Sequence, residues 1–126
     1  MKKVINTDKA PGAVGPYSQG IMAGDFLFIS GQLPLDPSTM KIVGSNAADQ
    51  ADLALKNMGA ILEEAGLGYE NLVKVTVLLN DMNDFVSVNE VYAKFFSSDF
   101  PARAAFQVAR LPLDAFVEIE AIAYKG

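Results

Sequence analysis

The chain has 126 residues, of which 51% are hydrophobic and 20% charged, and its formal net charge is -5. It contains no histidine and no cysteine, which excludes imidazole bases, thiolate nucleophiles, disulfides and metal sites built from these residues. Any chemistry must therefore use carboxylates, hydroxyls, lysine, arginine or backbone groups. The hydrophobic fraction excludes a disordered chain, and the length predicts a single domain over residues 1–126.

The acidic balance opposes binding to nucleic acid, because such binding depends on Lys and Arg side chains that displace counterions from phosphates. No apolar run reaches the ~18 residues needed to span a bilayer. The first residues become polar before the apolar core of a signal peptide could develop. We therefore expect a cytoplasmic protein that binds neither nucleic acid nor a membrane, and the absence of cysteine agrees with a reducing compartment.

The first elements in chain order are short strands and an ordered loop. A strand is expected near Lys3–Asn6, and the Pro- and Gly-rich segment 10–16 forms a loop that delivers Tyr17 to the next strand. Segments 18–23 and 26–32 have the pattern of a hairpin joined by Gly24 and Asp25.

Two helices are expected, with a strand between them. The first runs from its N-cap Asn46 to Ala65 and ends at Gly66, because its apolar residues recur at helical spacing. The second runs from about Met82 to Ser97 and buries a stripe of aromatic residues. This stripe consists of Phe85, Tyr92 and Phe96. The strand between the helices spans 72–79 and turns alternate residues toward them. These residues are Val73, Val75, Val77 and Leu79.

Strands at 103–108 and 116–124 complete the order βββαβαββ. Strands joined through helices imply at least one parallel pair, so we predict an α+β fold with a mixed sheet and both helices on one face. The opposite face then carries several apolar side chains, and large exposed apolar patches are rare on soluble monomers. This face therefore predicts oligomerisation through the sheet. Its apolar residues are Leu78, Phe106, Ile122 and Tyr124.

Arg103 lies in a mostly apolar run at the start of a predicted strand. Its planar guanidinium matches a carboxylate with paired donors. Two interpretations stay open: an anchor for an acidic ligand, or a structural ion pair with a nearby glutamate. Arg110 is interpreted as a surface or interface charge.

Glu118 and Glu120 alternate with apolar residues, which places both carboxylates on one face of the last strand, about 6.6 Å apart by strand rise. For Glu120 the structural alternatives are pairing with Arg103 or an exposed position at the sheet edge. A glycosidase-like carboxylate pair would fit this separation, but a small domain without Trp offers little platform for a sugar chain.

Three further polar residues are candidates for ligand contacts. Asn89 falls within the aromatic stripe, where a buried amide needs a partner, and it would usually tie the helix to a strand or subunit. Tyr17 and Ser30 could donate to a ligand, although local turn and strand-end hydrogen bonds are the commoner use. The oxygen-rich segment 80–84 departs from an EF-hand loop and is better explained by helix capping.

Six segments together resemble the RidA/YjgF family, in order and over nearly the whole chain. They are Gly15–Gly20, Ile29–Gln32, Val88–Tyr92, Phe100–Arg103, Val108–Pro112 and Ile119–Ala123. The resemblance implies a chorismate-mutase-like α+β fold assembled as a homotrimer, with sites at the subunit clefts. It also implies hydrolysis of 2-iminobutanoate and 2-iminopropanoate to 2-oxo acids and ammonia, and this reaction requires no cofactor.

By the family pattern, Arg103 would hold the substrate carboxylate and Glu120 would position or activate the attacking water. Tyr17, from a neighbouring subunit, would line the pocket with further residues. These are Ser30, Gly31 and Asn89. Many members carry Arg-Ser-Cys where this chain has Arg103-Ala104-Ala105, so no thiol-dependent role is expected. The backbone N–H of Ala105 can still face a carboxylate.

The resemblance implies a functional link to a PLP-dependent dehydratase acting on threonine or serine, which would form the imine. The alternative function is a non-catalytic trimer that binds small carboxylates or proteins as a regulator. Cleavage of RNA, a third option, fits poorly with a charge of -5 and no histidine.

Overall fold

The strands of the computed structural model, which describes residues 1–126, form one mixed six-stranded sheet in the order β1-β2-β3-β6-β4-β5. Neighbouring strands are antiparallel except β4 and β5, which run parallel. The predicted element order and the predicted parallel pair are therefore confirmed. The strands are β1 Lys2–Ile5, β2 Gly20–Ala23, β3 Phe26–Gln32, β4 Leu72–Leu79, β5 Ala102–Gln107 and β6 Val117–Tyr124.

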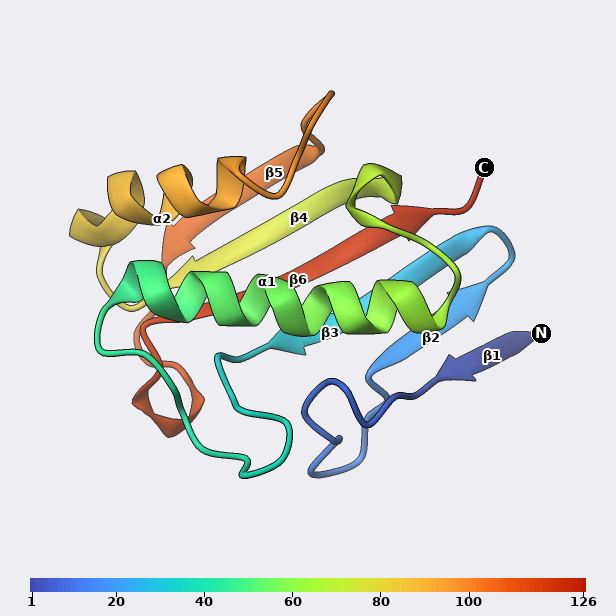
Figure 1. Cartoon of the computed structure of the whole chain (residues 1–126), viewed down its shortest axis with the longest axis horizontal. Coiled ribbons are helices and arrows are strands. Elements are labelled where there is room, and N and C mark those ends of the chain that lie inside the picture. The colour runs from blue at the N-terminus through green and yellow to red at the C-terminus, as the bar shows by residue number, and fades with distance from the viewer.

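Helices α1 (Ala47–Glu64) and α2 (Phe85–Ala93) cover the same face of the sheet, as predicted (Figure 1). Asn46 caps α1, because its side-chain oxygen accepts a hydrogen bond from the Asp49 N–H at 2.8 Å. Gly66 follows the helix with φ 76°, a conformation that favours glycine. The buried face of α1 packs against β3 and β6 in the main hydrophobic core.

The second helix is shorter than the predicted Met82–Ser97. A 3₁₀ turn at Met82–Asp84 precedes α2, and the Asp81 side chain caps it by accepting the Asn83 N–H. Capping is therefore confirmed for this turn, whereas Asp84, the N-cap residue of α2 itself, makes no side-chain capping hydrogen bond. Beyond Ala93 the backbone bonds link residues three apart, which tightens the helix end. The tight turn lets Phe95 and Phe96 pack edge-on against Tyr69.

The face assigned to Val73 by simple alternation is wrong. Leu72 pairs with Ala123 of β6 and Lys74 pairs with Ile122, so β4 contains one extra residue there. This bulge reverses the alternation at the start of the strand. Leu72 therefore enters the core while Val73 is 41% exposed, and the predicted alternation holds from Val75 onward.

The sheet face opposite the helices carries the apolar side chains that the sequence assigned to it. Phe106 and Tyr124 are each more than 40% exposed, and Leu78 and Ile122 are partly exposed. Phe28, which the sequence pattern did not assign to this face, pairs with Ile122 and is 46% exposed there. No element covers this face within the chain (Figure 1). None of the helices combines the length and the apolar character that a membrane crossing requires.

Candidate functional site

The guanidinium of Arg103 packs against side chains on one face of helix α2. Its guanidinium carbon lies 5.4 Å from the centre of the Phe85 ring and 4.9 Å from the centre of the Tyr92 ring. Its Nη1 donates a hydrogen bond of 2.7 Å to Asn89 Oδ1. Residues 85, 89 and 92 recur at helical spacing, so Phe85 and Tyr92 of the predicted stripe form a clamp for one arginine together with Asn89. Phe96, the third member of the stripe, packs against Tyr92 instead. The clamp orients the guanidinium by cation–π contacts and one amide.

No carboxylate neutralises Arg103 within the chain. The two ion pairs of the structure join Lys56 to Asp52 and Arg110 to Asp114. The structural ion pair considered for Arg103 is therefore absent, and the remaining guanidinium donors have no partner in the chain. They border a cavity of about 370 Å³. It is lined by Asn89, Tyr92, Ala93, Phe100, Pro101 and Arg103. This arrangement can accept a carboxylate.

A second and larger cavity, of about 760 Å³, is lined by residues of three loops. These loops gather at one end of the central strands (Figure 1). Its walls come from the Pro- and Gly-rich loop, the end of β3, the segment after β3 and the 3₁₀ turn Pro112–Asp114. The residues that line it include Glu118 and four of the candidate site residues identified from the sequence. These four are Tyr17, Ser30, Gly31 and Glu120.

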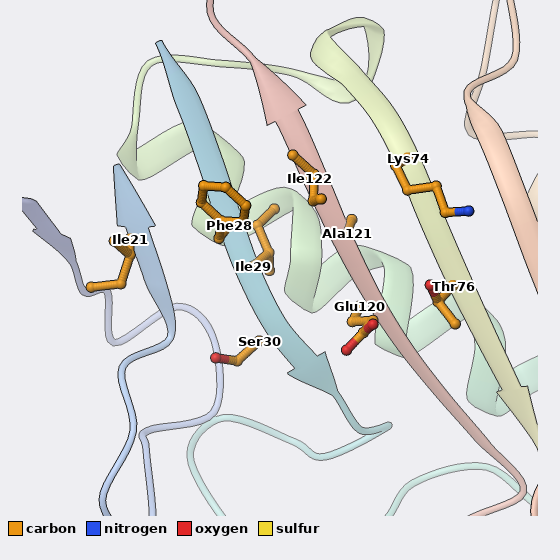
Figure 2. Close-up of a pocket in the computed structure, with 9 residues that line it drawn as sticks. All are labelled: Ile21, Phe28, Ile29, Ser30, Lys74, Thr76, Glu120, Ala121 and Ile122. Carbon is orange, nitrogen blue, oxygen red and sulfur yellow. The ribbon is translucent and has the colours of Figure 1, made fainter. Parts of the chain in front are cut away.

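A bulge in β3 positions two of these residues. Ile29 pairs with Ala121 of β6 and Gln32 pairs with Ile119, so Ser30 and Gly31 both lie opposite Glu120. Figure 2 shows Glu120 between Ser30 on one side and Thr76 on the other. The Ser30 hydroxyl donates to the Ser18 carbonyl at 2.6 Å. Its strand-end hydrogen bond is therefore confirmed, and the hydroxyl oxygen remains an acceptor.

Tyr17 is positioned by a buried amide that the sequence analysis did not identify. Gln19 is 1% exposed, and its Oε1 accepts the Thr7 N–H at 2.7 Å. Its Nε2 donates to the carbonyls of Thr7 at 2.9 Å and Pro11 at 2.8 Å. These bonds fix the loop that leads to Tyr17, whose side chain is 50% exposed at the cavity. The signal in the sequence was a polar residue at the entry to an apolar strand.

Replacing Gln19 with alanine should lower the free energy of unfolding by about 2–4 kcal/mol, since buried groups of Thr7 and Pro11 would lose their partners. Urea unfolding followed by circular dichroism measures this change. The matched control is Gln107→Ala, because Gln107 makes one exposed hydrogen bond, to the Met82 N–H, and its loss should cost about 1 kcal/mol or less. Equal losses in the two variants would contradict the anchoring role of Gln19.

Glu118 and Glu120 lie on the same face of β6 and both border the larger cavity. Neither carboxylate has a hydrogen bond or an ion pair within the chain. Burial, and then the negative charge of Glu120, raise the pKa of Glu118 above its ordinary value. The Glu118 carboxylate lies over Gly31, and a Cβ at position 31 would overlap it. Only glycine at position 31 allows this placement of Glu118.

Within one chain, Arg103 and Glu120 lie on opposite faces of the sheet. Arg103 pairs with Val75, which is buried beneath the helices, whereas Glu120 pairs with Thr76 on the open face. The pairing of Glu120 with Arg103 is therefore not present in the chain. The candidate residues form two groups. Asn89, Arg103 and Ala105 form one group, and Tyr17, Ser30, Gly31 and Glu120 form the other.

Comparisons with known proteins cover the chain almost completely. A family model described as Endoribonuclease L-PSP matches residues 7–125. The 2-iminobutanoate/2-iminopropanoate deaminase of Homo sapiens is 53% identical over 126 residues, which are 100% of this chain and 92% of that protein. A RutC family protein of Pyrococcus horikoshii is 56% identical over 125 residues, 99% of each chain.

Solved structures show the same fold. The crystal structure of E. coli TdcF with bound serine superposes with a TM-score of 0.94 at 47% identity, covering 98% of this chain and 99% of that chain. The YjgF gene product of E. coli gives a TM-score of 0.94 at 46% identity, with the same coverage. Both groups of candidate residues lie within the matched region.

Proposed function

Since this chain belongs to the endoribonuclease L-PSP family, which includes the RidA/YjgF proteins, we propose that it hydrolyses 2-imino acids to 2-oxo acids and ammonia. The expected substrates are 2-iminobutanoate and 2-iminopropanoate, the compounds named for its human relative. The observation that carries the proposal is the uncompensated Arg103, oriented by Phe85, Asn89 and Tyr92. A fixed guanidinium with free donors matches the carboxylate of an imino acid.

A complete site requires two copies of the chain. The copy that contributes Arg103 and Asn89 would also offer the backbone of Ala105, because β5 is an edge strand with unpaired main-chain groups. The neighbouring copy would contribute Tyr17, Glu120 and the bulge of β3. Because the two groups differ, the contact is head-to-tail, and three such contacts close into a ring. The open apolar face of the sheet supports a homotrimer with three inter-subunit sites.

The reaction follows from positioning and proton transfer. Arg103 would hold the carboxylate of the protonated imine, whose carbon is already electrophilic. Glu120, unpaired and facing the larger cavity, would accept a proton from water as the oxygen attacks that carbon. Orientation of the two reactants lowers the entropic part of the barrier, and a carboxylate general base contributes about 10²–10⁴-fold. No step requires a cofactor, an imidazole or a thiol.

The imine itself is unstable in water, so an enzyme that forms it must supply it. A PLP-dependent dehydratase acting on threonine or serine releases such a species, and the two enzymes would share the cytoplasm.

An endoribonuclease, as in the family description, would need cations to hold phosphates. The larger cavity instead presents two carboxylates without a cation.

The deaminase assignment is tested with the imine generated in place by threonine dehydratase. Purified protein should accelerate ammonia release above the uncatalysed rate, in proportion to its concentration, while threonine consumption stays constant. Semicarbazide, which traps the imine, should form less adduct in the presence of the protein. Binding of 2-oxobutanoate without any acceleration would instead indicate the non-catalytic carboxylate-binding protein.

A further inference from the structure

The proposed function leaves Glu118 without a role, although Glu118 borders the same cavity as Glu120. We propose that Glu118 is a second catalytic carboxyl, which holds a proton and donates it to the nitrogen of the hydrated imine so that ammonia can leave. This assignment rests on the proposed function and adds the group that completes the proton transfers.

The position of Glu118 is fixed by the two strands beside β6. Glu118 pairs with Leu78 of β4 and Glu120 with Thr76, so the two carboxylates project from alternate residues of one strand face. On the other side, the bulge of β3 brings Gly31 under the Glu118 side chain, where no Cβ would fit. Glu118 is thereby held half-buried at the wall of the cavity.

No cation within the chain compensates two negative charges at this place. Lys74 of β4 extends away from Glu120 (Figure 2). Arg110, in the loop before Pro112, is paired with Asp114 at 2.8 Å. The Tyr17 phenol also borders the cavity but carries no positive charge. Two nearby carboxylates without a cation from their own chain favour a state in which one of them is protonated. In the completed site, the charge of Arg103 from the neighbouring copy would be balanced by the substrate carboxylate and not by this pair. Glu118, the more buried of the two, is the one that keeps the proton.

The chemistry requires such a donor. Amide ion cannot leave from the tetrahedral intermediate, so the nitrogen must be protonated before the C–N bond breaks. A chain without histidine or cysteine must supply this proton from a carboxyl, a phenol or a lysine. Glu118 is the protonated carboxyl beside the base Glu120, and the two roles match the different environments of the two groups.

All protons are accounted for in the cycle. Glu120 takes a proton from water as the C–O bond forms at the iminium carbon, and Glu118-COOH then gives its proton to the amine nitrogen. As the C–N bond breaks, the hydroxyl oxygen forms the carbonyl and returns its proton to Glu118. The proton on Glu120 leaves with ammonia as ammonium. The net reaction is iminium plus water to 2-oxo acid plus ammonium, with both carboxyls restored.

The test is Glu118→Gln, which keeps the size of the side chain and removes the transferable proton. We expect kcat to fall about 10²-fold with KM changed little, the effect typical of a lost general acid. In the wild type, kcat should fall as the pH rises through the raised pKa of Glu118, because the donor is then ionised. Glu118→Gln should lack this alkaline limb. Glu63→Gln, an exposed change on α1, is the matched control.

An independent measurement tests the proposal even if the Glu118→Gln variant fails to fold or assemble. Carbon-13 NMR of the carboxyl groups in the wild-type protein should show Glu118 titrating above an ordinary glutamate, and Glu120→Gln should lower that pKa. Wild-type kcat and an unchanged alkaline limb in a folded Glu118→Gln protein would overturn the assignment, as would ordinary titration of Glu118. Failure of the wild type to accelerate ammonia release would refute the proposed function itself, whatever the variant shows.

Discussion

Replacing Arg103 with alanine is expected to lower kcat/KM for imino acid hydrolysis by about 10²–10³-fold, since truncating one partner of a buried charge pair costs about 2–5 kcal/mol. The guanidinium has no carboxylate partner within the chain, and its cavity is open to an anionic ligand. KM should rise more than kcat falls, because the carboxylate is bound before and during the reaction. The assay is ammonia release with the imine generated in place.

Two further variants separate charge from shape at this position. Arg103→Lys keeps the positive charge but cannot offer paired planar donors. Its kcat/KM should therefore be lowered nearly as much as that of Arg103→Ala. Arg110→Ala removes an exposed arginine that pairs with Asp114 and should leave kcat/KM unchanged. Thermal unfolding of Arg103→Ala checks that loss of packing on Phe85 and Tyr92 does not explain the result. Wild-type kinetics in a folded Arg103→Ala protein would contradict the carboxylate anchor.

The second large effect concerns Glu120. Glu120→Gln should lower kcat by about 10²–10⁴-fold, because the amide cannot accept a proton from water. KM should change little, since the arginine clamp formed by Phe85, Asn89 and Tyr92 lies on the other face of the sheet and is unaffected. Glu63→Gln serves again as the control for a charge change. A kcat equal to that of the wild type would remove Glu120 from the mechanism.

The two variants also test each other. If each site combines Arg103 of one copy with Glu120 of the next, Arg103→Ala and Glu120→Gln subunits can form intact sites only when mixed. Random mixing in equal amounts, by joint unfolding and refolding, should restore about a quarter of the wild-type activity, as expected for head-to-tail contacts. Mixed oligomers without any recovered activity would contradict an inter-subunit site.

Local patterns in the sequence were sufficient to predict the elements and the layer arrangement. Helix α1 followed from its spacing, its cap Asn46 and its stop Gly66, because these signals act within a few residues. The hairpin at Gly24 and Asp25 followed from a local pattern as well. The parallel pair and the apolar second face followed from the order of the strands and helices along the chain. The sequence also identified Arg103 as a charged residue within a mostly apolar run.

Register and long-range contacts, which no local pattern contains, required the tertiary structure. The bulges at Val73 and at Ser30-Gly31 exist only relative to β6, and each changes which residues face the helices or Glu120. Only tertiary packing shows Arg103 clamped on one face of the sheet and Glu120 free on the other.

The first observation on this chain, the absence of histidine and cysteine, excluded whole classes of mechanism by composition alone. Composition could not indicate which carboxylate would accept a proton and which would donate one. Tertiary structure alone distinguishes Glu118, half-buried against Gly31, from the exposed Glu120 two residues later. The physical reason is that a carboxyl's proton affinity depends on its solvent, its neighbours and its partners, which the fold brings together from distant parts of the chain.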